Sequence, residues 1–112
     1  IYNENIEVHI RSIFLQGLLL MNKHNRPKKF NKWNLLWNRW DDWLEENNVT
    51  PVQATISFSL SDYRITKVIV GVNSLDQLKE IISAANCNIN KFPQDLNFSD
   101  VALLNPSQWE IL

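Results

Sequence analysis

The chain contains only two glycines, Gly17 and Gly71, and each follows an apolar segment with the pattern of a β-strand. Residues 6–11 alternate apolar with polar side chains, and residues 65–70 are β-branched and apolar around one lysine. Strands that alternate with helices and end in glycine turns are typical of βα units with a parallel sheet. Because two strands alone do not make a stable sheet, we expect the chain to need a partner or further strands of its own fold.

The segment between the two strands is rich in tryptophan at helical spacing. Apolar residues recur there at steps of three and four, which predicts an amphipathic helix: Phe30, Trp33, Leu36, Trp37, Trp40, Trp43 and Leu44. At this spacing, tryptophans indicate buried packing more strongly than stacking on a base or a sugar. The neighbouring charges are interpreted as solvated surface: Arg26, Lys28 and Lys29 before the helix, and Asp41, Asp42, Glu45 and Glu46 near its end.

Two sequence signals disagree over residues 51–61. Thr50, Pro51 and Gln53 form a helix-start signal, since threonine caps, proline suits the first helical position and glutamine completes a capping box. The strict alternation of apolar and polar residues from Val52 to Leu60 instead predicts a strand. These residues alone leave the choice between helix and strand open.

The second glycine leads into another helix start. Ser74 and Gln77 form a capping box, and apolar residues line one face of a helix predicted over 74–86. Residues 87–112 are mostly polar, and we predict an extended tail with one short turn. The expected organisation is therefore a single segment, 1–112, with a strand and loop at 6–22, helices within 30–61, a strand at 65–70, the helix at 74–86 and the tail.

The composition excludes several classes of function. Eleven basic and 12 acidic residues give a net charge of -1, which argues against a nucleic-acid surface. The single cysteine, Cys87, cannot form an internal disulfide, and we expect a cytoplasmic protein. The longest apolar run, Leu18 to Met21, is too short to span a bilayer, so no membrane partner is expected. No histidine or cysteine has metal-ligand spacing, and we predict no metal site.

Read together, the two glycine segments resemble a known family. Residues 10–20, Ile-Arg-Ser-Ile-Phe-Leu-Gln-Gly-Leu-Leu-Leu, resemble the seventh strand and following loop of bacterial aldo/keto reductases. Residues 67–80, Lys-Val-Ile-Val-Gly-Val-Asn-Ser-Leu-Asp-Gln-Leu-Lys-Glu, are similar to the eighth strand and helix of that family. The Asn-Pro-Ser-Gln-Trp at 105–109 also looks like the tail of one branch. The resemblance implies an α/β fold, with this chain as the C-terminal βα units of a TIM (β/α)8 barrel, present as a fragment.

The resemblance also implies cofactor-binding residues. In the family the first loop wraps the pyrophosphate of a nicotinamide cofactor and the second turn holds its adenosine end. The positions of this sequence that match are Ser12, Phe14 and Leu15 in the first loop, and Gly71, Asn73, Gln77 and Glu80 in the second turn. The cofactor expected from the family is NADP. NAD is the alternative, because the first turn of the last helix has no arginine that could bind a 2′-phosphate. A helix within 51–61, starting at Thr-Pro, is also what the resemblance implies.

The function implied is the cofactor-binding C-terminal part of an NAD(P)-dependent oxidoreductase that reduces a small carbonyl substrate by hydride transfer. The family's catalytic tyrosine, lysine, aspartate and histidine lie on earlier strands, and nothing here matches them, so the chain alone is expected to be non-catalytic. The competing hypothesis is a non-catalytic binding module that self-associates through its exposed strand edges, as a homo-oligomer.

Overall fold

The computed structural model describes residues 6–87, 89, 92 and 99–111. It divides into two compact units, each built from two stretches of the chain. The first unit comprises the described residues of Ile1–Ile13 and Thr50–Phe92, and the second comprises those of Phe14–Val49 and Pro93–Leu112. Parts of the tail predicted at 87–112, namely 88, 90–91, 93–98 and 112, lie outside the described residues.

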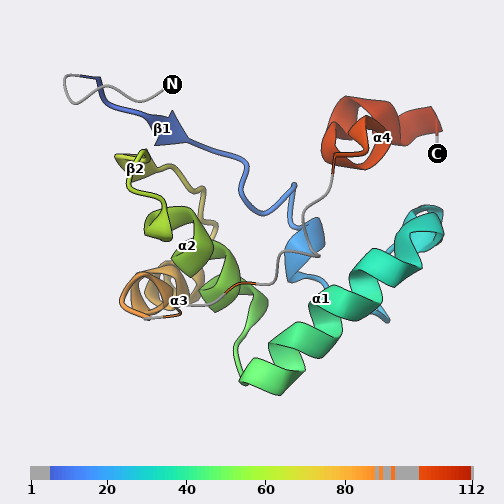
Figure 1. Cartoon of the computed structure of the whole chain (residues 1–112), viewed down its shortest axis with the longest axis horizontal. Coiled ribbons are helices and arrows are strands. Elements are labelled where there is room, and N and C mark those ends of the chain that lie inside the picture. The colour runs from blue at the N-terminus through green and yellow to red at the C-terminus, as the bar shows by residue number, and fades with distance from the viewer. Residues whose placement is uncertain (1–5, 88, 90–91, 93–98, 112) are drawn as a thin grey trace. The chain divides into compact units, whose positions relative to one another are not determined.

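The first unit contains a two-stranded parallel sheet, β1 (His9–Ile10) and β2 (Lys67–Val68), as Figure 1 shows. His9 pairs with Lys67 and Ile10 with Val68. The N–H of Ile69 donates to the carbonyl of Ile10 at 2.8 Å, one residue beyond β2. The predicted parallel pairing is confirmed, but both strands are shorter than the 6–11 and 65–70 that the sequence indicates. A strand extends only as far as its residues pair with a neighbouring strand. In this two-stranded sheet, the pairing covers two residues of each strand.

Helix α2 (Pro51–Ser61) resolves the conflict between the two signals in favour of the capping box. Thr50 Oγ1 accepts from the N–H of Gln53 at 3.1 Å, and Gln53 Oε1 accepts from the N–H of Thr50 at 2.9 Å. Three of the alternating polar residues carry small hydroxyls, and the helix itself satisfies two of them. Thr55 donates to the carbonyl of Pro51 at 2.7 Å and Ser59 to that of Thr55 at 2.9 Å. Buried serine and threonine therefore imitate a strand pattern without requiring a strand.

Helix α3 (Leu75–Ala85) packs against α2 and completes the first unit. Ala84 is buried in α3, and Ser57 of α2 donates to the carbonyl of Cys87, just after α3, at 3.3 Å. The helix also leaves apolar side chains in solvent, with exposed fractions of 65% for Leu75 and 55% for Ile82. The prediction of a helix over 74–86 is confirmed to within one residue at each end.

The second unit is organised around helix α1 (Asn34–Asn47), which continues a 3₁₀ helix, Lys28–Trp33. The chain leaves α1 through Asn48, whose φ of 53° is left-handed, a usual way to end a helix. The tail contributes α4 (Val101–Leu104) and a 3₁₀ helix, Pro106–Ile111. The prediction of an extended tail with one short turn is therefore wrong for 101–111. Asp100 caps α4 by accepting from the N–H of Ala102 at 3.0 Å, a signal that the sequence prediction did not use.

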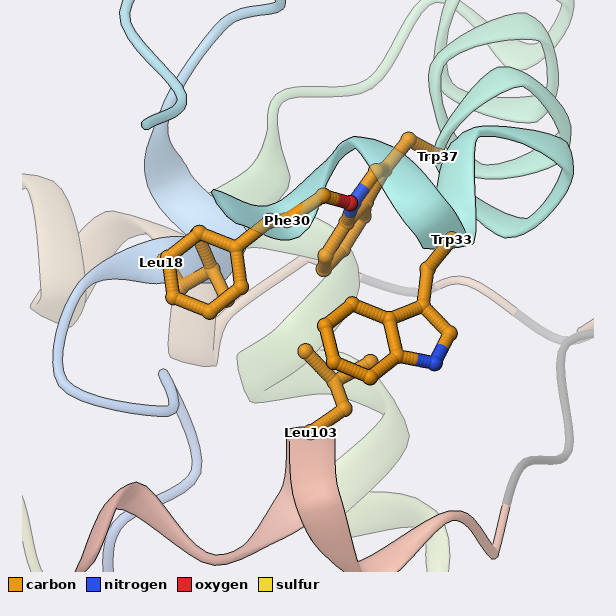
Figure 2. Close-up of a cluster of buried hydrophobic side chains, with 5 residues drawn as sticks. All are labelled: Leu18, Phe30, Trp33, Trp37 and Leu103. Carbon is orange, nitrogen blue, oxygen red and sulfur yellow. The ribbon is translucent and has the colours of Figure 1, made fainter. Parts of the chain in front are cut away.

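The core of the second unit is a cluster of five buried apolar side chains from three segments, shown in Figure 2: Leu18, Phe30, Trp33, Trp37 and Leu103. Their exposed fractions run from 1% for Leu18 to 6% for Trp33. The indole N–H of Trp37 donates to the carbonyl of Phe30 at 3.1 Å. The interpretation of the tryptophans as packing is confirmed for Trp33 and Trp37, and Trp40 packs against the same cluster.

Candidate functional site

The carboxyl ends of the two parallel strands lie at one edge of the sheet in the first unit. Ser12 follows β1 by two residues and Gly71 follows β2 by three, and the register pairs Ile10 with Val68. Ligands of α/β proteins bind outside the carboxyl ends of parallel strands. Two of the predicted cofactor residues, Ser12 and Gly71, therefore follow adjacent strands at the edge where a ligand is expected.

The loop after β1 has an unusual backbone. Ser12, Leu15 and Gln16 have φ values of 60°, 51° and 54°, and Gly17 follows with 84°. Left-handed backbone suits glycine and costs a side-chain-bearing residue about 1–2 kcal/mol. Strained residues of this kind gather at ligand clamps and other functional sites. Ser12 belongs to the first unit, and Leu15, Gln16 and Gly17 belong to the second.

The first loop also differs in how far each predicted residue reaches solvent. Ser12 is exposed, and Phe14 and Leu15 are half-buried. Leu15 packs against the aromatic cluster of the second unit, so its side chain is structural as well as a predicted cofactor contact. The carbonyl of Phe14 accepts from the N–H of Leu19 at 3.2 Å, which folds the loop back on itself. The loop therefore offers an anion its backbone groups, the Ser12 hydroxyl and the exposed Gln16 amide.

The turn after β2 is exposed throughout residues 71–80. Ser74 Oγ accepts from the N–H of Gln77 at 3.2 Å, as the predicted cap requires. The Gln77 side chain, however, accepts from the N–H of Asn73 at 2.7 Å instead of that of Ser74. The predicted capping box is thus formed on one side only, and the second bond ties Asn73 and Gln77 together. Two of the predicted adenosine-site residues therefore lie in hydrogen-bond contact, and a ligand bound by Gln77 would accept from its Nε2 amide.

The two glycines have different structural requirements. Gly17 has a φ of 84°, which a side chain would strain whatever the space around it. A Cβ placed on Gly71 would meet no atom within 4 Å, and its φ lies outside the left-handed range. The backbone therefore favours glycine at position 17, and neither its conformation nor its packing favours glycine at position 71.

The charge at the second turn bears on the type of cofactor. Asp76 is an acidic residue in the first turn of α3, and it is exposed. A carboxylate at a helix start favours the helix and repels a further phosphate placed beside it. Glu80, one turn later, is also exposed. Both carboxylates suit a neutral or hydroxyl-bearing group better than a phosphate monoester.

No group of three or more metal-ligating side chains gathers among the described residues. His9 Nε2 lies 3.0 Å from Glu7 on an exposed surface, and Tyr63 is 79% exposed. Among the described residues, these two side chains therefore lie on the surface. Within the described part of the chain, no helix has the length and hydrophobicity that crossing a membrane demands.

A parallel pair of strands with a helix after the second strand is typical of α/β proteins, which bind ligands outside the carboxyl ends of their strands. The chain belongs to the aldo/keto reductase family, since the sequence model of that family matches residues 1–95. The resemblance drawn from the two glycine segments is thereby confirmed. The family implies a TIM-barrel architecture and an oxidoreductase-type activity for the parent protein. A comparison with curated proteins found no match.

Proposed function

We propose that the chain is the C-terminal, cofactor-holding part of a nicotinamide-dependent aldo/keto reductase. The observation that carries the proposal is the parallel register of β1 with β2. Because of it, Ser12 and Gly71 both follow carboxyl ends of strands at the same edge of the sheet. In this proposal 1–112 is one segment that supplies the last two βα units of a barrel. The parent reduces a small carbonyl substrate, and a tyrosine elsewhere in the barrel donates the proton.

Three features of the described residues support the proposal of a dinucleotide cofactor. The first loop offers a hydroxyl and strained backbone, the second turn is fully exposed, and position 71 leaves space beside its backbone. In the proposal, Ser12, Phe14 and Leu15 hold the pyrophosphate. The adenosine end is held by Gly71, Asn73, Gln77 and Glu80. When bound, the cofactor supplies the hydride, and these residues bind and orient it without taking part in proton transfer.

The proposal covers NADP and NAD, and charge separates them. The exposed carboxylate of Asp76 beside the predicted adenosine turn repels a 2′-phosphate, and screening by salt keeps the effect small. We therefore expect NADH to bind at least as tightly as NADPH. An Asp76→Lys variant should shift the preference toward NADPH, and an unchanged ratio would place the ribose away from this turn.

The experiment that tests the proposal is a fluorescence titration of NADH and NADPH into the purified chain. Gln77→Ala and Gly71→Val should weaken binding, and Ser83→Ala, an exposed position further along α3, is the matched control. Equal affinity in all four proteins would contradict the proposed site. The chain alone should show no turnover of carbonyl substrates, and robust reductase activity would show that catalytic residues are present after all.

A second candidate function, self-association as a non-catalytic module, is favoured by a stripe of exposed apolar side chains on α3. Leu75, Leu78 and Ile82 are 65%, 40% and 55% exposed at helical spacing. Ile69, just after β2, is also 53% exposed. Apolar surface of this kind is usually covered in an assembly. Sedimentation velocity separates the two functions, because a monomer at micromolar concentration would exclude self-association as the role of the chain.

A further inference from the structure

The loop at 14–20 contains three consecutive residues in the left-handed region. Leu15, Gln16 and Gly17 have φ values of 51°, 54° and 84°. Only the glycine adopts this backbone without cost, since a β-carbon clashes with the following carbonyl. The loop therefore needs contacts from elsewhere to keep this conformation, because strain persists only where its surroundings impose it.

Contacts with the aromatic cluster supply that constraint. Leu18, directly after the three left-handed residues, is 1% exposed within the cluster, and Leu15 and Leu19 pack against it. The N–H of Leu18 donates to the carbonyl of Leu15 at 3.1 Å. The indole N–H of Trp40 donates to the carbonyl of Leu19 at 3.3 Å. Leu15 and Leu18 stand at the two ends of the strained turn, and their contacts with the core of the second unit hold it in place.

The tail segment, residues 99–111, completes that core. Leu103 of α4 is 1% exposed and closes the cluster, as Figure 2 shows. Trp33 donates its indole N–H to Asp100 Oδ2 at 3.1 Å. The ring of Trp109 packs edge-on against Phe30 with a centroid separation of 4.8 Å. The indole of Trp109 in turn donates to the carbonyl of Leu103 at 2.9 Å.

We propose that the tail segment is a clamp that fixes the conformation of the cofactor loop, with Leu103 as its positioning residue. Leu103 contacts the cluster that anchors Leu18, and Leu18 holds the left-handed turn in place. The consequence for binding rests on the proposed function, since the loop has to be a pyrophosphate loop for its shape to affect cofactor affinity. The effect on the loop itself does not depend on the cofactor.

The test compares Leu103→Ala with Leu104→Ala in the full chain. The two leucines are adjacent in α4, and Leu104 is 44% exposed, so the second variant controls for changes to the helix alone. Hydrogen exchange of the amides of residues 18–20 and the backbone couplings of Leu15 and Gln16 report on the loop. We expect Leu103→Ala to raise these exchange rates and weaken NADH binding by about tenfold, as the fraction of correctly folded loops falls. Leu104→Ala should leave both unchanged.

Rescue separates positioning from general destabilisation. Leu103→Met restores most of the side-chain volume. It should therefore recover the backbone couplings of the loop and the NADH affinity of the unsubstituted chain. Asp100→Ala, which leaves no core cavity, provides a second test if Leu103→Ala does not fold. It removes the bond from Trp33 and the cap of α4, and should raise exchange at residues 18–20 several-fold.

The outcomes distinguish the clamp from the proposed function. Failure of the unsubstituted chain to bind either NADH or NADPH would overturn the proposed function, and the couplings and exchange rates would still decide the clamp. The clamp would be overturned if Leu103→Ala and Asp100→Ala showed the same loop couplings and exchange rates as Leu104→Ala. Altered couplings with unchanged NADH affinity would confirm the clamp. They would also show that the cofactor does not bind at this loop.

Discussion

Replacing Asp41 with alanine should destabilise the second unit much more than replacing its neighbour Asp42. Arg26 has a side chain that is only 5% exposed, and Asp41 holds both ends of its guanidinium. Nη1 donates to Oδ2 at 2.9 Å and Nη2 to Oδ1 at 2.6 Å. The guanidinium also lies over the indole of Trp37, with Cζ 4.8 Å from the ring centroid. Asp41→Ala would leave this cation buried against an aromatic ring without its counter-ion.

The magnitude follows from the burial of the pair. Removing one partner of a buried ion pair costs about 3–5 kcal/mol, because the other charge is left without compensation. The Asp41 side chain is 31% exposed, so water can reach part of the vacated position, and the carbonyl of Met21 still accepts from Arg26 at 3.1 Å. We therefore expect the lower end, about 3 kcal/mol, for Asp41→Ala. Asp42 is exposed on the same helix, and its replacement should stay within about 0.5 kcal/mol.

Urea denaturation followed by tryptophan fluorescence measures both variants, since the cluster that unfolds contains the indoles. Both changes replace aspartate with alanine within α1, so differences in helix propensity cancel. An Arg26→Met and Asp41→Leu double variant should recover most of the loss, because an apolar pair of similar volume avoids the buried charge. A difference of less than about 1 kcal/mol between the two single variants would refute the assignment of Arg26 as a buried charge held by Asp41.

Three further predictions concern the turns. Gly17→Ala should lower the free energy of unfolding by about 1 kcal/mol because its φ is left-handed, and Gly71→Ala should leave it unchanged, as thermal denaturation will show. Thr50→Val should cost about 1 kcal/mol through loss of the cap on α2, measured by the same melts. Hydrogen bonds from Arg64 lower the pKa of Asp62 to about 2, so any stability from this pair is present above the unfolded pKa and lost as pH falls toward 2. A carboxyl NMR titration with a midpoint near the ordinary value of about 3.9 would contradict it.

The secondary structure was predictable where it depends on interactions between residues that are close in the sequence. The cap at Thr50 and Gln53 outweighed the period-2 pattern because both of its hydrogen bonds close within one turn of chain. The order of the elements and the parallel pairing followed from strand-like segments that alternate with helical ones. The length of the strands did not follow, since a ladder depends on neighbours that periodicity in one segment does not describe.

Long-range pairing explains what the sequence prediction missed. Arg26 stands beside Lys28 and Lys29, and nothing in that basic run marks it for burial against Asp41, 15 positions later in the chain. The interpretation of all three as solvated is right for the exposed lysines and wrong for Arg26. In the same way, no local pattern predicts that Leu103 joins Leu18 in one core, because the segments meet only through tertiary packing.

The two glycines, which look equivalent in the sequence, provide different kinds of evidence. Glycine at position 17 is explained by its backbone, so glycine would be favoured there even in a chain that binds nothing. Glycine at position 71 has an ordinary backbone and open space around it, so neither conformation nor packing of the described residues accounts for it. In the proposed function, the cofactor that approaches the backbone from outside would account for it. The candidate site therefore depends more on Gly71, where the fold makes no demand, than on Gly17, where strain alone would select glycine.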